Sequence, residues 1–417
     1  MPRSTPQYDV VVAGGGPAGS TAATILAQHG RRVLLLEREP FPRYHIGESL
    51  IPYTWFTLNR LGVIERLRQS ANPKKYSVQF VSVEGRVSQP FYFFQTIDHE
   101  CAMTWQVLRS EFDGMLLDNA RAHGVDVRQN VVVRELITTD GRATGVRADR
   151  RGGGSDRFSA RAVVDATGRD TLLATRFGWK ERDPQLDKIA IWTYFTGAKR
   201  DPGLDEGATT VAYVPRKGWF WYIPLPDDVV SVGIVADRDY LYRDTRDPQA
   251  LLEREIARCA WIRDHVSCGT QVEPVRVTGE FSYRSRCAGG DGFCLIGDAF
   301  AFLDPIFSTG VFLALKSGEL AADAIHAALD AGGVTAHTFD AYATTQWQAL
   351  DGFRRLVLAF YDRTFSFREF LQIYPHVHGL LVDTLVGNIF KDLGPLQAAL
   401  DAFAGRPSAA ENSETTA

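Results

Sequence analysis

The sequence lacks the features of a disulfide-rich, zinc-binding or membrane-spanning protein. Its cysteines are odd in number and none are spaced as CxxC: Cys101, Cys259, Cys268, Cys287 and Cys294. This pattern argues against a disulfide framework and against a metal site. No apolar run approaches the roughly 18 residues that span a bilayer, and residues 1–7 lack the layout of a signal peptide. We therefore expect a cytoplasmic protein with no bound metal and no membrane span.

The chain also lacks an excess of charge of either sign. Its 46 basic and 50 acidic residues are mixed along 417 residues, and the formal net charge is −4. Such a chain has no field that would attract a polyanion, so nucleic acid is not an expected partner. The length is sufficient for two to three domains.

The first 37 residues contain a complete dinucleotide-binding unit. An apolar strand, a glycine turn, a helix of small residues and a second strand follow one another, and Glu37 ends the second strand. The glycines permit a tight turn, a close approach of the backbone to a pyrophosphate, and close packing of helix on strand. The helix N-terminus faces the phosphates, and a carboxylate at Glu37 accepts hydrogen bonds from ribose hydroxyls. The residues expected to contact the cofactor here are Gly14, Gly16, Ala18, Gly19 and Glu37.

A loop follows at residues 40–50, where two prolines and a glycine exclude regular structure. A loop beside a cofactor turn is usually a binding loop. Arg43 could pair with a phosphate, and Glu48 and Ser49 could lie near a flavin ring; the alternative is a solvated surface loop. Arg109, which begins an expected helix, could touch a phosphate or ring edge, or could be an ordinary surface charge.

Two later strands also end in polar or small residues. One ends at Asp165-Ala-Thr-Gly168, and another at Gly297-Asp298, where the Asp298 carboxylate could accept from a ribityl hydroxyl. A helix is then expected over residues 311–329. Free backbone amides at its positive end could hold a flavin carbonyl or a small anion, at Ser308, Thr309 and Gly310.

Residues 188–235 alternate in the manner of antiparallel strands joined by short turns. Trp219 and Trp221 point to one face because strand side chains repeat every two residues, and Tyr222 points to the other. The paired indoles would form a wall on the substrate side; the alternative is an aromatic stripe in the core. The aromatic-rich segment 91–105 is likewise expected to form strands.

Three stretches together separate FAD from NAD: the glycine turn with Glu37, the turn at residues 165–168, and Gly297-Asp298. They resemble the glutathione-reductase-type FAD fold shared by aromatic hydroxylases and geranylgeranyl reductases. Within that superfamily, Trp219-x-Trp221-x-Ile223-Pro224 is similar to the WxWxIP signature of flavin-dependent halogenases. The resemblance covers about residues 8–330 and implies FAD, used as FADH2, as the cofactor.

The expected fold class is therefore α/β. It has an FAD-binding Rossmann-like domain of the glutathione-reductase type, an antiparallel β-sheet substrate domain and a small helical C-terminal region. The expected ranges are 1–75, 106–187 and 286–330 for the FAD-binding domain, 76–105 and 188–285 for the substrate-side sheet, 331–404 for the helical region, and 405–417 for a disordered tail.

Other segments agree with the resemblance. Residues 45–49 look like the halogenase loop after the second strand, and residues 304–310 look like the segment of the family that binds flavin and halide. The resemblance implies FAD contacts at Arg43, Glu48, Ser49, Arg109, Asp298, Pro305 and Gly310. It implies chloride or bromide binding at Ser308, Thr309 and Gly310.

The essential lysine of the family lies in a KxGxxF stretch, which Lys75, Ser77 and Phe80 resemble. Ser77 replaces the usual glycine, so Lys74 stays open as the alternative to Lys75. The tryptophan-acting branch has a glutamate before the Ser-Thr-Gly turn, where this chain has Phe307. That departure points to the branch acting on phenols or pyrroles, some of whose members use carrier-tethered substrates.

The resemblance also implies a mechanism with a partner protein. A separate flavin reductase supplies FADH2, whose C4a-hydroperoxide converts chloride or bromide to hypohalous acid. The amine of Lys75 either hydrogen-bonds to the hypohalous acid or forms a haloamine, and an electron-rich aromatic substrate, free or tethered to a carrier protein, is then halogenated. Trp219 and Trp221 keep that substrate away from the hydroperoxide, so the catalytic residues implied are Lys75, Trp219 and Trp221.

Three other functions stay open. An FAD-dependent aromatic monooxygenase is the nearest, but the DG dipeptide that such enzymes usually carry is replaced here by Asp165-Ala-Thr-Gly168-Arg169-Asp170-Thr171. A geranylgeranyl-reductase-like enzyme gives no reason for the tryptophan pair. A non-catalytic flavoprotein that binds FAD for stability or partner contact is the option outside enzymes.

Overall fold

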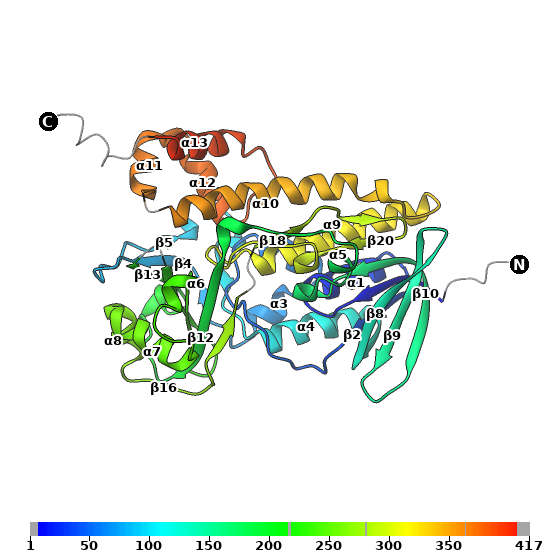
Figure 1. The fold of residues 1–417 in the computed structure, drawn as a ribbon, viewed down its shortest axis with the longest axis horizontal. Helices are drawn as coiled ribbons and strands as arrows, with labels where there is room; N and C mark the ends of the chain where they lie inside the picture. Colours follow the sequence, from blue (N-terminus) through cyan, green and yellow to red (C-terminus); the bar gives the residue numbers. More distant parts are fainter. Residues whose placement is uncertain (1–6, 216–217, 280–281, 363, 407–417) are drawn as a thin grey trace, which may run out of the picture. The chain divides into compact units, whose positions relative to one another are not determined.

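The computed structural model describes residues 7–215, 218–279, 282–362 and 364–406 (Figure 1). Most of the tail expected at 405–417 therefore lies outside the described residues. The chain divides into two compact units. Unit one comprises Met1–Asn72, Val107–Asp183 and Ser282–Trp347, and unit two comprises Pro73–Gln106, Pro184–Phe281 and Gln348–Ala417. The three-part domain division expected from the sequence stays a prediction.

Unit one is built on a largely parallel sheet with the strand order β19-β20-β10-β1-β2-β7. All neighbours in it are parallel except β19 and β20. The strands are β1 (Tyr8–Ala13), β2 (Val33–Glu37), β7 (Asp126–Gln129), β10 (Ser155–Asp165), β19 (Gly289–Gly290) and β20 (Phe293–Leu295). Parallel sheets are covered on both faces, which explains why Val10–Val12 and Leu34–Leu36 are almost wholly buried.

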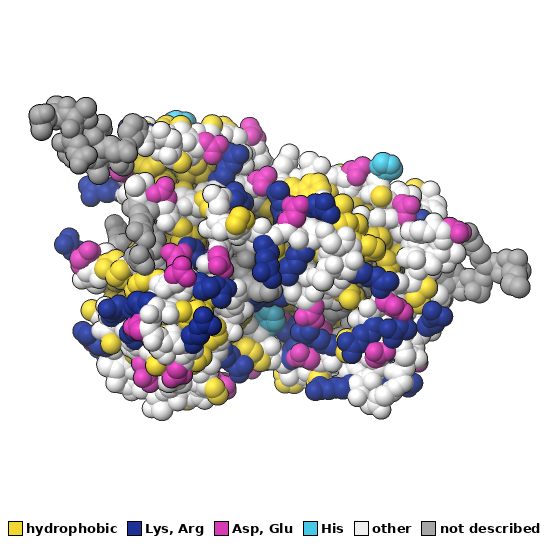
Figure 2. Space-filling model, viewed as in Figure 1, with side chains coloured by type: hydrophobic (Ala, Val, Ile, Leu, Met, Phe, Trp, Pro, Cys, Tyr) yellow, Lys and Arg dark blue, Asp and Glu magenta, His cyan; other side chains and the backbone are white. Residues whose placement is uncertain are grey.

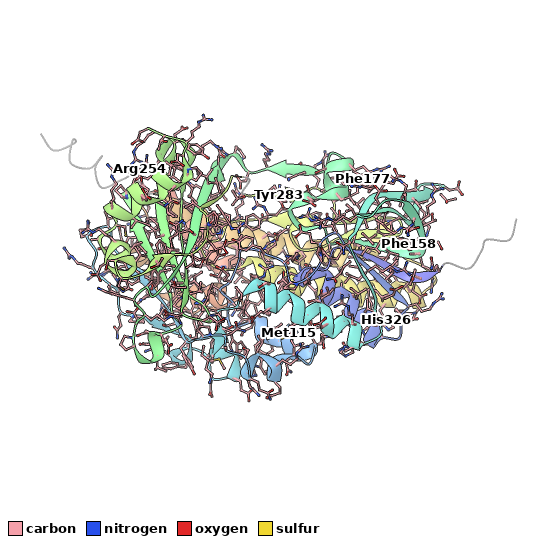
Figure 3. The ribbon with its side chains drawn as sticks, turned by 90° about the horizontal axis from the view of Figure 1, so that it is seen from below. Met115, Phe158, Phe177, Arg254, Tyr283 and His326 are labelled. Atoms are coloured by element: carbon pink, nitrogen blue, oxygen red, sulfur yellow. The ribbon has the colours of Figure 1, made fainter. Side chains whose placement is uncertain are left out.

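Helices of unit one include α1 (Pro17–Gln28), which packs against both α4 (Arg109–Ala122) and α9 (Gly310–Asp330). Figure 3 marks α4 by Met115 and α9 by His326. The remaining helices of the unit are short: α2 (Thr54–Arg60), α3 (Ile64–Arg68) and α5 (Leu172–Arg176). The turn from β1 into α1 is the glycine turn predicted to bind the cofactor.

Two smaller sets of strands complete unit one. The first half of β10 pairs in an antiparallel meander with β9 (Arg142–Arg150), which pairs in turn with β8 (Val131–Thr139). A separate three-stranded antiparallel sheet has the order β11 (Lys180–Arg182), β18 (Tyr283–Ser285) and β21 (Ala301–Phe302).

Unit two is built on one large sheet with the order β16-β12-β15-β14-β13-β4-β5, in which β17 also pairs with β12. The predicted antiparallel character holds for its long central strands, but β13 and β4 are parallel. The strands are β4 (Ser77–Val81), β5 (Phe91–Tyr92), β12 (Lys188–Thr196), β13 (Thr209–Val214), β14 (Gly218–Pro224), β15 (Val229–Asp237), β16 (Thr270–Gln271) and β17 (Arg276–Thr278). A separate short ladder joins β3 (Lys74–Lys75) to β6 (Thr104–Trp105).

Alternation along β14 separates the two faces of this sheet. Phe220 and Tyr222 belong to a buried apolar cluster that includes Trp261 and Ile262 of the helical segment after β15. Trp219 and Trp221 therefore lie on the opposite face, as predicted. The helices after β15 are α6 (Arg238–Leu241), α7 (Pro248–Arg258) and α8 (Ala260–Val266).

The C-terminal segment is helical, as expected. Helix α10 (Asp340–Tyr361) has its first residues assigned to unit one and its last residues, from Gln348, to unit two. It is followed by α11 (Phe367–Ile373), α12 (His378–Val386) and α13 (Gly394–Ala404).

The prediction of strands throughout residues 91–105 is wrong. β5 has two residues, and 3-10 turns follow at Phe93–Gln95 and Glu100–Ala102 before β6. The His99 ring accepts a hydrogen bond from the amide of Cys101, which favours a turn over an extended strand. High aromatic content is shared by strands and by packed turns, so composition alone did not separate them.

Charges are interspersed over the surface in view in Figure 2, where basic and acidic side chains alternate without a large field of one sign. Within the described residues, no helix is long and apolar enough to cross a membrane. Nor do those residues contain a cluster of three or more His, Cys, Asp or Glu that could hold a metal ion.

We predict that Gly14→Ala lowers the thermal midpoint of the apoprotein far more than Gly30→Ala. Both glycines have positive φ, 111° and 76°, so both substitutions carry backbone strain of about 1–2 kcal/mol. A Cβ at Gly14 would lie 2.2 Å from the carbonyl oxygen of Ala166, whereas nothing lies within 4 Å of a Cβ at Gly30. Thermal unfolding followed by circular dichroism measures the difference; equal midpoints for the two variants would contradict the close packing of β1, α1 and β10.

Candidate active site

Glu37 is held at the glycine turn. One carboxylate oxygen, Oε2, accepts a 2.7 Å hydrogen bond from the amide of Gly15, and Oε1 accepts from the amide of Glu39 at 2.9 Å. The side chain is almost completely buried. Because it ends β2 next to the turn that precedes α1, its carboxylate lies where a dinucleotide ribose is recognised in this type of fold.

Arg43 lies beside the same turn. Its Nη2 is 3.4 Å from the position that a Cβ would occupy on Gly16, and the guanidinium packs on the ring of Phe41. The same nitrogen lies 3.3 Å from a carboxylate oxygen of Asp113. The cation is thus fixed at the helix N-terminus, a place suited to a diphosphate.

Arg109 is a buried residue that organises the loop at residues 45–49. It makes two hydrogen bonds to Asp113, at 2.8 and 3.0 Å, and its Nη1 donates to the carbonyl oxygens of Ile46 and Gly47 at 2.7 and 3.1 Å. The alternative of an ordinary surface charge is therefore wrong for this residue. Asp113, which the sequence did not single out, accepts hydrogen bonds from Arg109, forms an ion pair with Arg43 and is fully buried.

The loop that Arg109 supports contains a neutral His45 and is held by buried contacts. Burial, reinforced by the nearby Arg109 cation, lowers the pKa of His45 to about 3. Glu48 and Ser49 are buried, and the Glu48 carbonyl oxygen accepts a 2.7 Å hydrogen bond from Val107. The alternative of a solvated surface loop is wrong for these two residues.

Asp298 lies in the turn after β20, where Gly297 has φ of 57° and donates from its amide to the hydroxyl of Ser317 on α9 at 2.8 Å. Burial raises the pKa of Asp298 to about 6, against the opposing effect of Arg169 and Arg109. The Arg109 cation therefore acts electrostatically on the Asp298 carboxyl and also holds the loop at residues 45–49, and all three lie in unit one.

The segment predicted to bind halide leads directly into α9. Ser308 has φ of 55°, and its amide donates to the carbonyl of Pro305 at 3.0 Å. Thr309 is at the N-cap position of the helix that begins at Gly310, and its side chain makes no capping hydrogen bond. The first four amides of a helix have no partner within it. The free amides at this end of α9 can therefore donate hydrogen bonds to an anion bound at the positive end of the helix dipole.

The residues of unit one fit a bound FAD. The glycine turn lets the start of α1 pack directly on the end of β1, since a Cβ at Gly19 would lie 2.0 Å from the Gly14 carbonyl oxygen. Anionic, cationic and amide groups then follow at Glu37, Arg43 and the start of α9, matching ribose, diphosphate and a carbonyl or anion.

Lys75 and Lys74 occupy opposite sides of strand β3. Lys75 is 1% exposed and Lys74 is exposed. The Nζ of Lys75 lies 5.6 Å from the centre of the Phe93 ring, and burial lowers its pKa to about 7. A substantial fraction of Lys75 is thus a neutral amine at neutral pH, which a nucleophile requires.

The two indoles of β14 form a continuous surface. Their ring centres are 6.1 Å apart, and that of Trp221 lies 6.2 Å from Trp192 on β12. Trp221 donates from Nε1 to the hydroxyl of Ser231 at 3.0 Å, and Trp219 donates from Nε1 to the hydroxyl of Tyr361 at 2.9 Å.

Gly233 on β15 is a supporting residue that sequence reasoning missed. A Cβ there would lie 2.3 Å from a ring carbon of Trp221 and 2.4 Å from the Cβ of Trp192. The glycine therefore makes the space in which the Trp221 ring lies. A glycine within an otherwise β-branched strand signals close approach by a neighbour, and it was the available clue.

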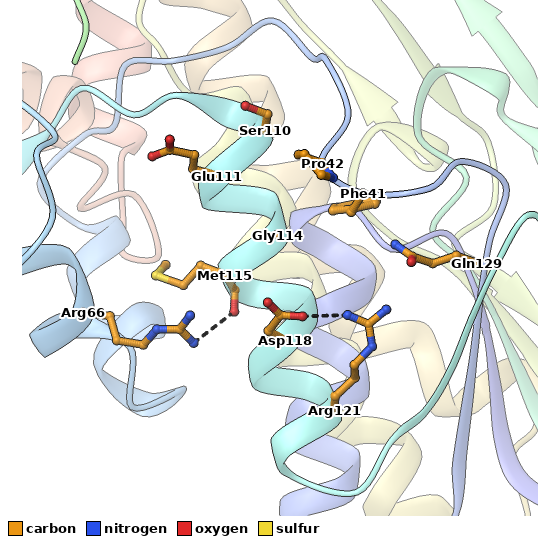
Figure 4. A pocket seen from close by; sticks show the side chains of 10 residues that line it. All are labelled: Phe41, Pro42, Arg66, Ser110, Glu111, Gly114, Met115, Asp118, Arg121 and Gln129. Atoms are coloured by element: carbon orange, nitrogen blue, oxygen red, sulfur yellow. Dashed lines mark hydrogen bonds and ion pairs between the residues drawn. The ribbon is translucent and has the colours of Figure 1, made fainter. Parts of the chain in front are cut away.

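A pocket of about 320 Å³ lies on the outer side of α4, beside Phe41 and Pro42 (Figure 4). Arg66 donates to the carbonyl of Met115 at 3.4 Å and Arg121 pairs with Asp118 at 2.6 Å along its wall. None of the residues predicted to bind cofactor or halide lines this pocket. The pocket does, however, include the ring of Phe41, on which the Arg43 guanidinium packs.

A family model described as tryptophan halogenase matches residues 9–105 and 82–367. The chain is 35% identical over 328 residues to a 1H-pyrrole-2-carbonyl-[peptidyl-carrier protein] brominase of Pseudoalteromonas luteoviolacea, covering 78% of each protein. It is 30% identical over 389 residues to a 1H-pyrrole-2-carbonyl-[peptidyl-carrier protein] chlorinase of Pseudomonas fluorescens, covering 88% of this chain and 86% of the relative.

Solved structures agree with these relatives. The flavin-dependent brominase Bmp2 has a TM-score of 0.85 and 29% identity, covering 98% of this chain and all of the other. The myxobacterial chondrochloren halogenase CndH, an FAD-dependent halogenase, has a TM-score of 0.81 and 31% identity, covering 96% and 98%. The likeness extends over both units of the chain.

We predict that burial of Lys75 makes the stability of the protein depend on pH. The unfolded chain keeps the lysine proton up to its ordinary pKa of 10.5, whereas the folded chain releases it near 7. The unfolded state thus binds more protons between these values, and this residue's contribution to stability rises with pH by at most about 1.4 kcal/mol per unit.

Thermal midpoints of Lys75→Met and wild type, compared from pH 6 to 10, measure this effect. The advantage of the Lys75→Met variant should shrink as the pH rises above 7. Lys74→Met is the matched control, since its side chain is exposed, and it should keep the wild-type pH profile. Identical profiles for all three proteins would show that Lys75 is not desolvated.

Proposed function

The chain belongs to the tryptophan halogenase family and is a flavin-dependent halogenase, and from this premise we propose that it halogenates a pyrrole ring carried by a carrier protein. The observation that carries the proposal is the buried amine of Lys75, with a pKa of about 7, in the unit that also holds the indole pair. The substrate class is supported by the two pyrrolyl-carrier relatives and by Phe307, where the tryptophan-acting branch has a glutamate.

FAD would be held by unit one. Glu37 would accept from the ribose, Arg43 would neutralise the diphosphate, and Asp298 would accept from a ribityl hydroxyl. Arg109 would act on the flavin side by holding the backbone of residues 46–47, to which it donates. When bound and reduced by a separate flavin reductase, FAD supplies, with O2, the oxidising power that turns halide into hypohalous acid.

Chloride or bromide would be held at the turn of Ser308, Thr309 and Gly310. The amides of Thr309 and Gly310 would donate to it, since the Ser308 amide already donates to the Pro305 carbonyl. Oriented amides and a helix N-terminus stabilise a small anion without a bound metal. The left-handed conformation of Ser308 directs the chain into α9 at this point. Phe307 and Thr309 are buried, and their burial would limit hydration of a bound anion and so strengthen its interaction with the amides.

Lys75 would carry the halogen to the substrate. Its neutral amine either donates a hydrogen bond to hypohalous acid or attacks the halogen, forming an N–halogen bond and releasing water. The ring carbon of the substrate then takes the halogen without its bonding electrons, and loss of a ring proton restores aromaticity and the amine. Pyrrole is electron-rich enough to react without a carboxylate to activate it, consistent with Phe307.

Trp219 and Trp221 would restrict the organic substrate rather than react with it. Their rings are buried and fixed by hydrogen bonds from both indole nitrogens. Excluding the substrate from the reduced cofactor suppresses direct hydroxylation, the reaction of the nearest alternative enzyme class.

We predict halogenated product from pyrrolyl-carrier protein when the enzyme is supplied with FAD, a flavin reductase, NADH and bromide or chloride. Mass spectrometry of the carrier measures the mass added, and free pyrroles and phenols form the comparison panel. If only free phenols were halogenated, the proposed substrate would have to be changed from a carrier-bound pyrrole to a free phenol. Hydroxylated products without any halogenation would overturn the proposal in favour of an aromatic monooxygenase.

We also predict that Lys75→Met abolishes halogenation while leaving FAD affinity within about two-fold, since the residues proposed to contact FAD belong to unit one and Lys75 belongs to unit two. Loss of a group that acts only in the reaction commonly costs 10²-fold or more. Product yield and FAD titration by fluorescence measure the two effects. Lys74→Met, the exposed neighbour, should halogenate at the wild-type rate; the reverse result would transfer the role to Lys74.

A further inference from the structure

The end of helix α10 belongs to the indole face of unit two. The Trp219 Nε1 donates a 2.9 Å hydrogen bond to the hydroxyl oxygen of Tyr361, the last residue of the helix, which lies 142 positions later in the chain. An indole nitrogen is a donor only, and a buried one needs an acceptor. Tyr361 supplies that acceptor.

Neighbouring contacts fix the helix end to the same row of the sheet. Tyr213 on β13 lies directly opposite Trp219, so the two side chains share a face. Phe360 stacks on Tyr213 with ring centres 5.4 Å apart and an interplanar angle of 22°. Consecutive residues at the end of α10 thus contact two adjacent residues on the indole face.

The buried side chain of Lys188 lies over the Tyr361 ring. The Nζ of Lys188 lies 4.2 Å from the centre of that ring, and Lys188 is paired with Asp237, its partner across β12 and β15. Lys188 is 7% exposed. A desolvated cation over an aromatic ring restrains the ring more strongly than a solvated one.

The two indoles therefore depend on different parts of the chain. Trp221 is held by the sheet itself, through Ser231 and the space at Gly233 on the adjacent strand. Trp219 is oriented by a residue outside the sheet. Its position is consequently the one that a change in the C-terminal helix can alter.

We propose that Tyr361 is a positioning residue that fixes the Trp219 indole, with Lys188 and Asp237 fixing Tyr361. The inference rests on the proposed function, in which Trp219 keeps the aromatic substrate from being hydroxylated. The end of helix α10 then influences the selectivity between halogenation and hydroxylation through the orientation of the Trp219 indole.

The test compares Tyr361→Phe with wild type by the ratio of hydroxylated to halogenated product and by the indole N–H resonance of Trp219. That resonance is assigned as the one missing in Trp219→Phe. We expect the resonance to move and the product ratio to rise about five-fold, the change in population that corresponds to losing one net hydrogen bond. FAD affinity should stay unchanged.

Tyr222→Phe is the matched control. Tyr222 lies on the same strand as Trp219 but on the opposite face, and its hydroxyl donates to the Lys199 carbonyl at 2.6 Å. The Tyr222→Phe substitution removes a tyrosine hydroxyl from the same sheet, and we expect it to leave the product ratio unchanged. Should Tyr361→Phe fail to fold, Lys188→Met tests the same assembly, with a smaller rise in the ratio expected.

Combining Tyr361→Phe with Trp219→Phe should raise the ratio no further than Trp219→Phe alone, because the bond is already absent. A moved resonance with an unchanged ratio in Tyr361→Phe, while Trp219→Phe raises the ratio, would overturn the inference and leave the proposed function standing. No change in ratio for Trp219→Phe would overturn both the inference and the proposed role of Trp219. An equal rise of the product ratio in Tyr222→Phe would show that Tyr361 has no specific positioning role and only contributes to packing.

Discussion

Unit one depends on the close packing of backbone around Ala18. The first turn of α1 reaches the loop after β20 and the side of α9 because no side chains intervene. A Cβ at Gly318 would lie 2.4 Å from the Ala18 carbonyl oxygen, and one at Gly297 would lie 2.9 Å from the Ala18 Cβ. Glycines at the contact points therefore allow three elements to pack closely: the glycine turn, the Asp298 turn and helix α9. All three would face one cofactor.

This packing gives Ala18 a meaning beyond its place in the glycine motif. A larger side chain there would separate α1 from α9, and the amides at the start of α9 would no longer be set relative to the turn that follows β1. The charged side chains of Arg43, Arg109 and Asp113 are attached to this closely packed backbone. Asp113 joins Arg43 to Arg109, and Arg109 joins α4 to the loop at residues 46–47. The groups proposed to bind the cofactor would thus be held before any ligand arrives, which would lower the ordering cost of binding.

Local sequence was sufficient to predict the β1–α1–β2 unit, the helix beginning at Arg109 and the face shared by Trp219 and Trp221. Each follows from periodicity or a glycine turn within a few residues. Asp113, Ser231 and Tyr361 could not be found this way, because their roles arise from partners that are distant in sequence. The parallel pairing of β13 with β4 was hidden for the same reason. The turns at residues 93–102 were missed because aromatic composition does not distinguish a strand from a packed turn.

The contrast between Lys74 and Lys75 shows how strongly a short strand can separate identical residues. Side chains alternate across β3, so one lysine lies in water and its neighbour lies against Phe93. A shift of one residue in the pairing of β3 with β6 would exchange their environments, because strand side chains have a period of two. Lys75 is opposite Thr104, and Lys74 is opposite Trp105. The register of a two-residue ladder therefore decides which amine is desolvated, and with it which amine can be neutral near pH 7.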